Sequence, residues 1–116
     1  MKPEKIEYFQ NLLEFQKQAL LAAKDAAGDS ARPVTLDQAS VGRLSRMDAM
    51  QGQAMAVEMQ RRREIGLQRI EAALLRIKTG EYGLCTVCEE EIADRRLEID
   101  PSVTLCIECA ARRERS

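Results

Sequence analysis

The chain has 116 residues, of which 45% are hydrophobic and 32% charged, with 18 basic and 19 acidic side chains. This balance argues against a strongly basic nucleic-acid binder and against an acidic tail protein. The sequence has no histidine, which excludes histidine-based triads, general bases and metal ligands. Aromatic residues make up only 3%, whereas a small β-sandwich or barrel would need more aromatic filling. We therefore expect a mainly α-helical fold.

The first predicted helix spans about residues 3–27. Pro3 suits a first helical turn, and apolar residues then recur at alternating spacings of three and four. Such a heptad pattern predicts that one side of the helix packs against a second helix. The positions on this side are Ile6, Phe9, Leu13, Gln16, Leu20, Ala23 and Ala27.

Gly28 and Pro33 interrupt the heptad pattern, which predicts a turn over about residues 28–34. A second helix is expected from about residue 35 to residue 78, where glycines follow. Four methionines of this helix stand at helical spacing, and we interpret them as filling between the two helices rather than as a binding surface. They are Met47, Met50, Met55 and Met59.

Together these elements predict an antiparallel coiled-coil hairpin over residues 1–79. With a turn at residues 28–34, Ile6 would lie opposite about Glu58, so the first helix could not cover positions 65–78. The apolar side of that stretch would then pack against the remaining segment, residues 80–116, which holds all the cysteines and a short C-terminal tail. We expect a rod-shaped hairpin with a small module at its base.

The four cysteines form the pattern C-x2-C-x17-C-x2-C. They are Cys85, Cys88, Cys106 and Cys109. This spacing is typical of a zinc site, because two C-x2-C turns can place four thiolates around one ion at Zn–S distances of about 2.3 Å. Four sulfur ligands leave no open position for water or substrate, so we expect one structural Zn²⁺ whose binding helps a short segment to fold. Disulfides, a redox-active pair and an iron–sulfur cluster are the alternatives.

Several functions are not expected from this sequence. No nucleophile motif accompanies the closed metal site, so we predict neither an enzyme nor a small-molecule substrate. No run of 18 apolar residues is present, and the first five residues do not resemble a signal peptide, so we expect a cytoplasmic protein that does not span a membrane.

The cysteine segment also carries a dense set of family motifs. GEYGLCTVC at residues 80–88 is followed by EEI at 90–92, RRLE at 95–98, Pro101 and LCIEC at 105–109. Together they resemble the DksA/TraR-type C4 zinc-finger family. The resemblance implies a transcription regulator that binds RNA polymerase directly through its secondary channel, without sequence-specific DNA binding. It also implies that the coiled-coil tip lies near the active centre of the polymerase.

The tip motif of this family resembles D-x-x-D-x-A. Asp37 and Ala39 match its second aspartate and its alanine, while Asp48 begins a second partial match. Asp37 also stands where a helix N-terminus favours a carboxylate for purely structural reasons. The resemblance makes Asp37, Ala39 and Asp48 candidate polymerase contacts.

Residues 61–78 carry six basic side chains against two acidic ones. Arg61, Arg62 and Arg69 in this stretch either contact an acidic rim of the polymerase or belong to a solvated face. Relatives that respond to the alarmone ppGpp carry basic residues at the positions of Asp100 and Ala110. We therefore expect little ppGpp dependence, with Arg62 and Arg69 as the remaining candidate phosphate contacts.

Two other functional classes stay open. One is a nucleic-acid-binding zinc module, which would show a steep salt dependence. The other is an interaction protein that dimerises through its helices. In the cysteine module we expect Arg95 and Arg96 to pair with nearby acids among residues 89–94, and the basic C-terminal tail to form either a short helix or a frayed end.

Overall fold

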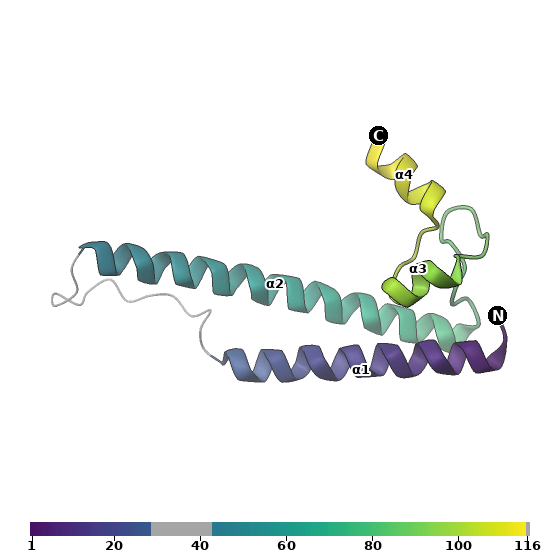
Figure 1. The fold of residues 1–116 in the computed structure, drawn as a ribbon, viewed down its shortest axis with the longest axis horizontal. Coiled ribbons are helices and arrows are strands. Elements are labelled where there is room, and N and C mark those ends of the chain that lie inside the picture. The colour runs from purple at the N-terminus through teal and green to yellow at the C-terminus, as the bar shows by residue number, and fades with distance from the viewer. Residues whose placement is uncertain (29–42, 116) are drawn as a thin grey trace.

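The computed structural model describes residues 1–28 and 43–115 and has a long helical hairpin with a small module at one end (Figure 1). The radius of gyration is 19.4 Å, whereas a globular domain of this length would have about 13 Å. The mainly α-helical, elongated architecture predicted from the sequence is therefore confirmed. The helices are α1 (Pro3–Ala27), α2 (Arg43–Thr79), α3 (Asp94–Ile99) and α4 (Ile107–Arg115).

The helix α1 lies antiparallel to the C-terminal half of α2 (Figure 1). The start of α1 and the end of α2 lie beside the module formed by residues 80–115, which we call the cysteine module. Phe9 and Leu13 of α1 are buried against Ile70 and Ala73 of α2. The N-terminal half of α2 extends beyond the end of α1 (Figure 1). Most of the turn predicted at residues 28–34, and the helix start predicted near residue 35, lie outside the described residues.

The register of the two helices differs from the prediction. The Leu20 Cδ1 atom lies 3.2 Å from the place where a Cβ on Gly66 would stand, so α1 does cover the stretch that we assigned to the cysteine module alone. The prediction that Ile6 lies opposite about Glu58 is therefore wrong. The predicted register assumes a turn at residues 28–34. In the structure, residues 28–42 separate α1 from the described part of α2.

The interpretation of the methionines as filling between the helices is also wrong. Met47, Met50, Met55 and Met59 are between 49% and 67% exposed. A set of buried or half-buried residues recurs along α2 at heptad spacing, and it includes two glutamines and an arginine. A search of the sequence for apolar residues alone therefore does not find the side of α2 that packs against α1. The residues of this set are Gln53, Ala56, Gln60, Arg63, Leu67, Ile70, Leu74 and Ile77.

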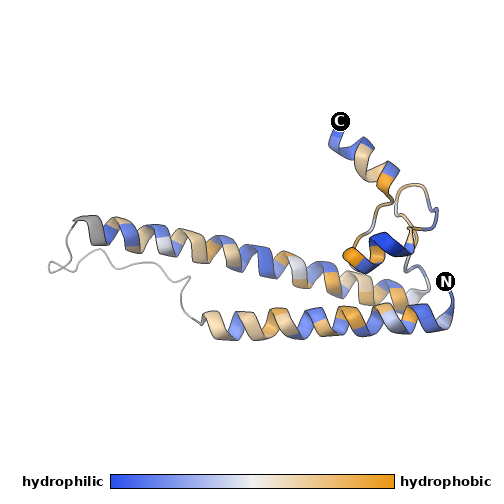
Figure 2. Cartoon of the chain, viewed as in Figure 1, coloured by the Kyte–Doolittle hydropathy of each residue, from blue (hydrophilic) through white to orange (hydrophobic). Residues whose placement is uncertain are grey.

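Hydrophobic residues continue along α2 past the end of α1 (Figure 2). Even so, no helix in residues 1–28 and 43–115 is long and apolar enough to span a membrane.

The two phenylalanines of α1 test this packing. Phe9 is 2% exposed and Phe15 is 72% exposed. We expect Phe9→Ala to lower the free energy of unfolding by about 3–5 kcal/mol, because it leaves a cavity between the helices and the cysteine module. Phe15→Ala is the matched control and should change it by less than about 0.5 kcal/mol. Equal effects in denaturant titrations would contradict this core.

Candidate metal centre

The first cysteine pair lies in a tight reversal after α2. Gly80 and Gly83 have φ values of 81° and 85°, a conformation that glycine adopts without a Cβ clash. The chain then folds back on itself, with the Ile92 amide donating to the Gly83 carbonyl and the Cys85 amide donating to the Glu90 carbonyl, both at 2.8 Å. This arrangement fixes the loop that carries Cys85 and Cys88.

The second cysteine pair lies at the start of α4. The Cys109 amide donates to the Cys106 sulfur at 3.4 Å, which orients that sulfur toward the first pair. The Thr86 amide donates to the Thr104 carbonyl at 2.9 Å and so ties the two cysteine loops together. The basic C-terminal segment, left open by the sequence, is helical to Arg115.

The four Sγ atoms all lie within 4.8 Å of one another, and those of Cys88 and Cys106 are 3.7 Å apart. A tetrahedral site with Zn–S bonds of about 2.3 Å has sulfur–sulfur edges of about 3.8 Å. A disulfide would need about 2.05 Å, so Cys88 and Cys106 are not bonded to each other. The sulfur-only donor set and its spacing therefore fit one structural Zn²⁺ without an open coordination position.

The pKa values of the cysteine thiols also favour a bound divalent cation. The backbone N–H of Cys88, with those of Cys106 and Val87, lowers the pKa of the Cys85 thiol to about 6. A hydrogen bond with Cys106, together with burial, raises the pKa of the Cys109 thiol to about 12. One thiolate is thus favoured, while four in this space would repel one another. A divalent cation offsets that repulsion and makes the fully deprotonated set stable.

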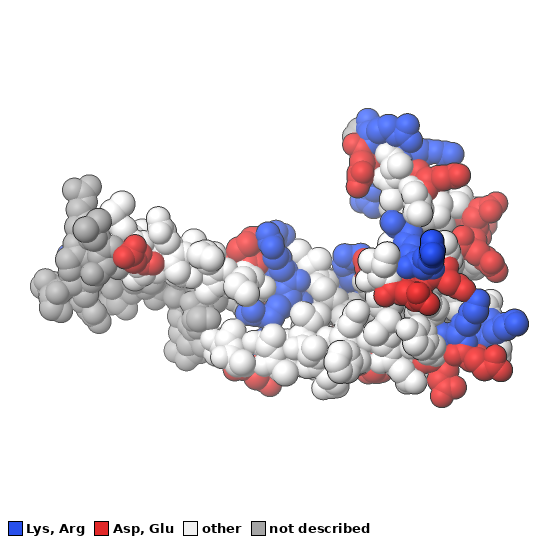
Figure 3. Space-filling view, in the orientation of Figure 1, with Lys and Arg blue, Asp and Glu red and all other residues white. Residues whose placement is uncertain are grey.

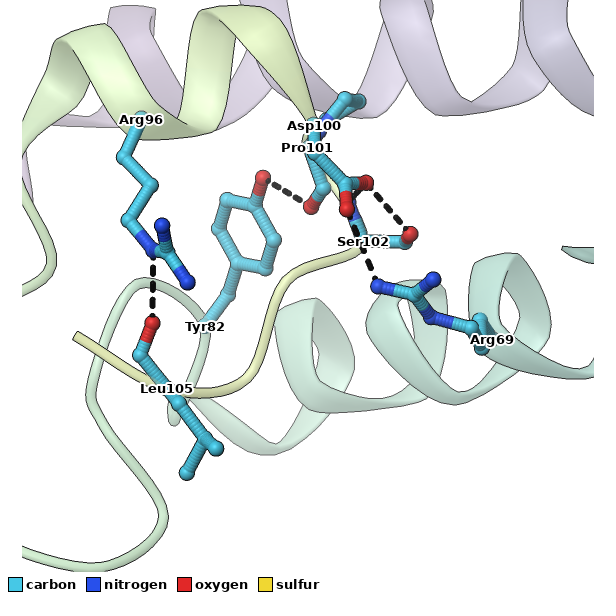
Figure 4. A network of polar contacts seen from close by, with 7 residues as sticks. All are labelled: Arg69, Tyr82, Arg96, Asp100, Pro101, Ser102 and Leu105. Atoms are coloured by element: carbon cyan, nitrogen blue, oxygen red, sulfur yellow. Dashed lines mark hydrogen bonds and ion pairs between the residues drawn. The ribbon is translucent and has the colours of Figure 1, made fainter. Parts of the chain in front are cut away.

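A second polar cluster joins the metal-binding module to the hairpin (Figure 4). The buried Tyr82 hydroxyl donates to the Pro101 carbonyl at 2.7 Å. Asp100 accepts from the Ser102 hydroxyl at 2.8 Å and from the Arg69 guanidinium at 2.9 Å. Burial, with Asp100 nearby, raises the pKa of Tyr82 well above its usual range, so this hydroxyl stays a donor. The bond from Arg69 holds Asp100 against α2, and the other two bonds hold residues 100–102 within the module.

The partner predicted for Arg96 is wrong. Its Nε donates to the Leu105 carbonyl at 2.8 Å rather than to an acid among residues 89–94. The Arg96 side chain is half-buried, so its guanidinium satisfies a carbonyl of the loop before Cys106 (Figure 4). A bond to a backbone carbonyl cannot be predicted from the positions of acidic residues in the sequence.

The structure does not gather the predicted polymerase contacts at one place. Arg61 and Arg62 are exposed and both pair with Glu58, whereas Arg69 lies beside the cysteine module with Asp100. Asp48 is exposed near the other end of α2. Asp37 and Ala39 lie outside the described residues.

The sequence analysis names Arg69 and Asp100 but misses the bond between them, which joins hairpin and module, and it does not single out Tyr82 or Ser102. One signal for them was present, because Asp100-Pro101-Ser102 is a typical turn in which an aspartate accepts from the residue two positions later. Indeed, the Ser102 amide donates to the Asp100 carboxylate at 3.2 Å. The bond from Tyr82 to Pro101 has no local signal, since 19 positions separate them.

Loss of one cysteine tests the metal centre. We expect Cys85→Ser to lose zinc and to lower the free energy of unfolding by at least about 3 kcal/mol, since the binding energy of a structural zinc is folding energy. Val87→Ser changes an exposed neighbour and should keep one zinc per chain. Elemental analysis and thermal unfolding measure both. Full zinc retention in Cys85→Ser would contradict the site.

Comparison with known proteins identifies the module. The family model of the prokaryotic DksA/TraR C4-type zinc finger matches residues 80–115. The RNA polymerase-binding transcription factor DksA of Haemophilus influenzae is 46% identical over 43 residues, which are 37% of this chain but only 30% of that protein. The protein of the same name from Caulobacter vibrioides is 27% identical over 115 residues, which are 99% of this chain and 80% of that one.

The fold of the whole chain is shared as well. The structure of the transcription factor DksA2 from Pseudomonas aeruginosa superposes with a TM-score of 0.79 at 28% identity, covering 99% of this chain and 87% of that one. Both the finger and the hairpin therefore have counterparts in the same group of proteins. Residues 80–115 thus match the DksA/TraR C4-type zinc finger, their four cysteines fit one structural Zn²⁺, and the whole chain shares the fold of DksA2.

Proposed function

We propose that this protein is a non-enzymatic transcription factor that binds RNA polymerase through the secondary channel, with its coiled-coil tip near the active centre. The observation that carries the proposal is the likeness of the complete hairpin-and-finger arrangement to DksA2 over 99% of the chain. A finger alone could serve many functions, whereas this combination is similar to proteins named as RNA polymerase-binding factors. Cys85, Cys88, Cys106 and Cys109 are the proposed zinc ligands.

The shape supports insertion into a channel. The molecule measures 62 × 33 × 20 Å, with the cysteine module at one end of the long axis (Figure 1). The buried residues of the hairpin lie near that module, and the side chains of α2 become exposed toward its N-terminal end. The module can thus anchor on the surface of the polymerase while the other end of α2 projects away from it.

The charges of the described residues support low ppGpp dependence. Arg69, a candidate phosphate contact, already bonds to the Asp100 carboxylate, which occupies a position that is basic in alarmone-responsive relatives. Arg62 shares Glu58 with Arg61. An incoming phosphate would compete with these carboxylates and would be repelled by them.

Competition for the polymerase tests the proposed function. We expect the protein to displace a known secondary-channel factor from bacterial core RNA polymerase. Asp37→Asn and Asp48→Asn should keep this binding, and the one that abolishes the effect on transcription identifies the tip residue. Failure of the zinc-loaded wild type to bind at micromolar concentration would contradict the proposal. Salt-dependent DNA binding or a concentration-dependent mass would then favour the two alternative classes.

An alarmone titration tests the regulation separately. We expect ppGpp to leave the effect of this protein on transcription unchanged at a concentration that saturates an alarmone-responsive relative assayed in parallel. The reason is that the Asp100 carboxylate neutralises Arg69, so no strong phosphate site forms from that pair. A large enhancement by ppGpp would contradict this part of the proposal while leaving polymerase binding intact.

A further inference from the structure

The short helix α3 carries acidic side chains on the side toward α1 and basic side chains on the other side. Asp94 and Glu98, four residues apart, lie toward α1. Asp94 accepts from the Lys5 ammonium group, and Glu98 borders a small cavity with Tyr8 of α1. In the space-filling view, acidic side chains lie between α3 and α1, and basic ones lie on the side of α3 away from α1 (Figure 3). The acidic side of α3 is therefore used within the molecule.

The other side of α3 has no such use. Arg95 is exposed and forms no hydrogen bond or ion pair with residues 1–28 and 43–115. Ile99, one turn further on the same side, is 86% exposed, the largest value among the exposed large apolar side chains of those residues. An unpaired cation beside a nearly fully exposed isoleucine has no evident role in the stability of this fold.

These two side chains border a groove between α3 and α4 of about 310 Å³. Ile99 and Val103 line one part of this α3–α4 groove, and Ile107, itself 62% exposed, lines another. Arg96 also borders the groove, and its bond to the Leu105 carbonyl holds the guanidinium in place. Asp100, whose carboxylate also lines the groove, already accepts from Arg69 and Ser102.

We propose that the α3–α4 groove docks an acidic segment of RNA polymerase that inserts one apolar side chain between Ile99 and Ile107. This inference rests on the proposed function and adds a contact separate from the hairpin tip. Charge complementarity selects the occupant, because Arg95 and Arg96 favour carboxylates beside the inserted side chain. A nucleic-acid backbone fits less well, since its phosphates would be desolvated against the isoleucines.

Two groove variants test the proposal on the zinc-loaded full chain. Ile99→Ser and Arg95→Glu should each weaken binding to core RNA polymerase by about tenfold or more, as a buried anchor at a protein interface does. Val87→Ser removes another exposed apolar side chain of the cysteine module, and Lys2→Glu makes the same charge change before the start of α1, both outside the groove. Both controls should bind like the wild type. Zinc content and melting temperature should be unchanged in all four variants, which separates lost contacts from unfolding.

A crosslinking measurement identifies the chemistry of the occupant. A photoreactive phenylalanine analogue at position 99 should crosslink to a polymerase segment in which acidic residues outnumber basic ones. Crosslinking to a basic segment would overturn the proposal, and so would wild-type affinity of both groove variants. In those cases the wild type still binds, and the proposed function stands. A wild type that does not bind polymerase would overturn both.

Discussion

The metal centre and the hairpin share one hydrophobic core, and the rest of the structure depends on that sharing. Phe9 of α1, Ile70 of α2 and Cys85, one of the proposed zinc ligands, belong to the same buried cluster. Tyr82 connects them, because its ring lies 6.0 Å from that of Phe9 and its hydroxyl bonds to the chain before the second cysteine pair. A zinc ion bound by the four cysteines would therefore also hold in place part of the core against which α1 and α2 pack.

The cysteine module could be predicted because its signals are local. A C-x2-C turn determines where two sulfurs point, so the spacing favours a zinc centre over a disulfide, a redox-active pair or an iron–sulfur cluster. The register of the helices could not be found in this way. Gln60 and Arg63 occupy positions facing α1, and the Nε of Arg63 is buried without a hydrogen-bond partner among the described residues. The spacing of apolar residues in the sequence cannot locate a helix–helix contact that includes polar side chains.

The ion pairs show a second limit of sequence reasoning. In the sequence, Asp100 is only an acidic residue before a proline. Its effect is larger in the structure, since the carboxylate also engages Arg69, which lies 31 positions earlier. The Asp100 carboxylate thus neutralises one cation on this surface. The fold decides this outcome, because only the packing of residues 100–102 on α2 brings the two side chains together.

The distribution of burial along the hairpin links this structure to its proposed use. The largest buried side chains of the helices lie next to the cysteine module, whereas Met47, Met50 and Met55 on the distal part of α2 are about half or more exposed. A free-standing coiled coil would be expected to bury such a stripe, since exposed apolar surface is costly. A helix whose apolar side chains become buried only when it binds a partner need not bury them in the free protein. Because the stable core and the exposed stripe lie at different ends of α2, the module can hold the fold together without constraining what the distal end contacts.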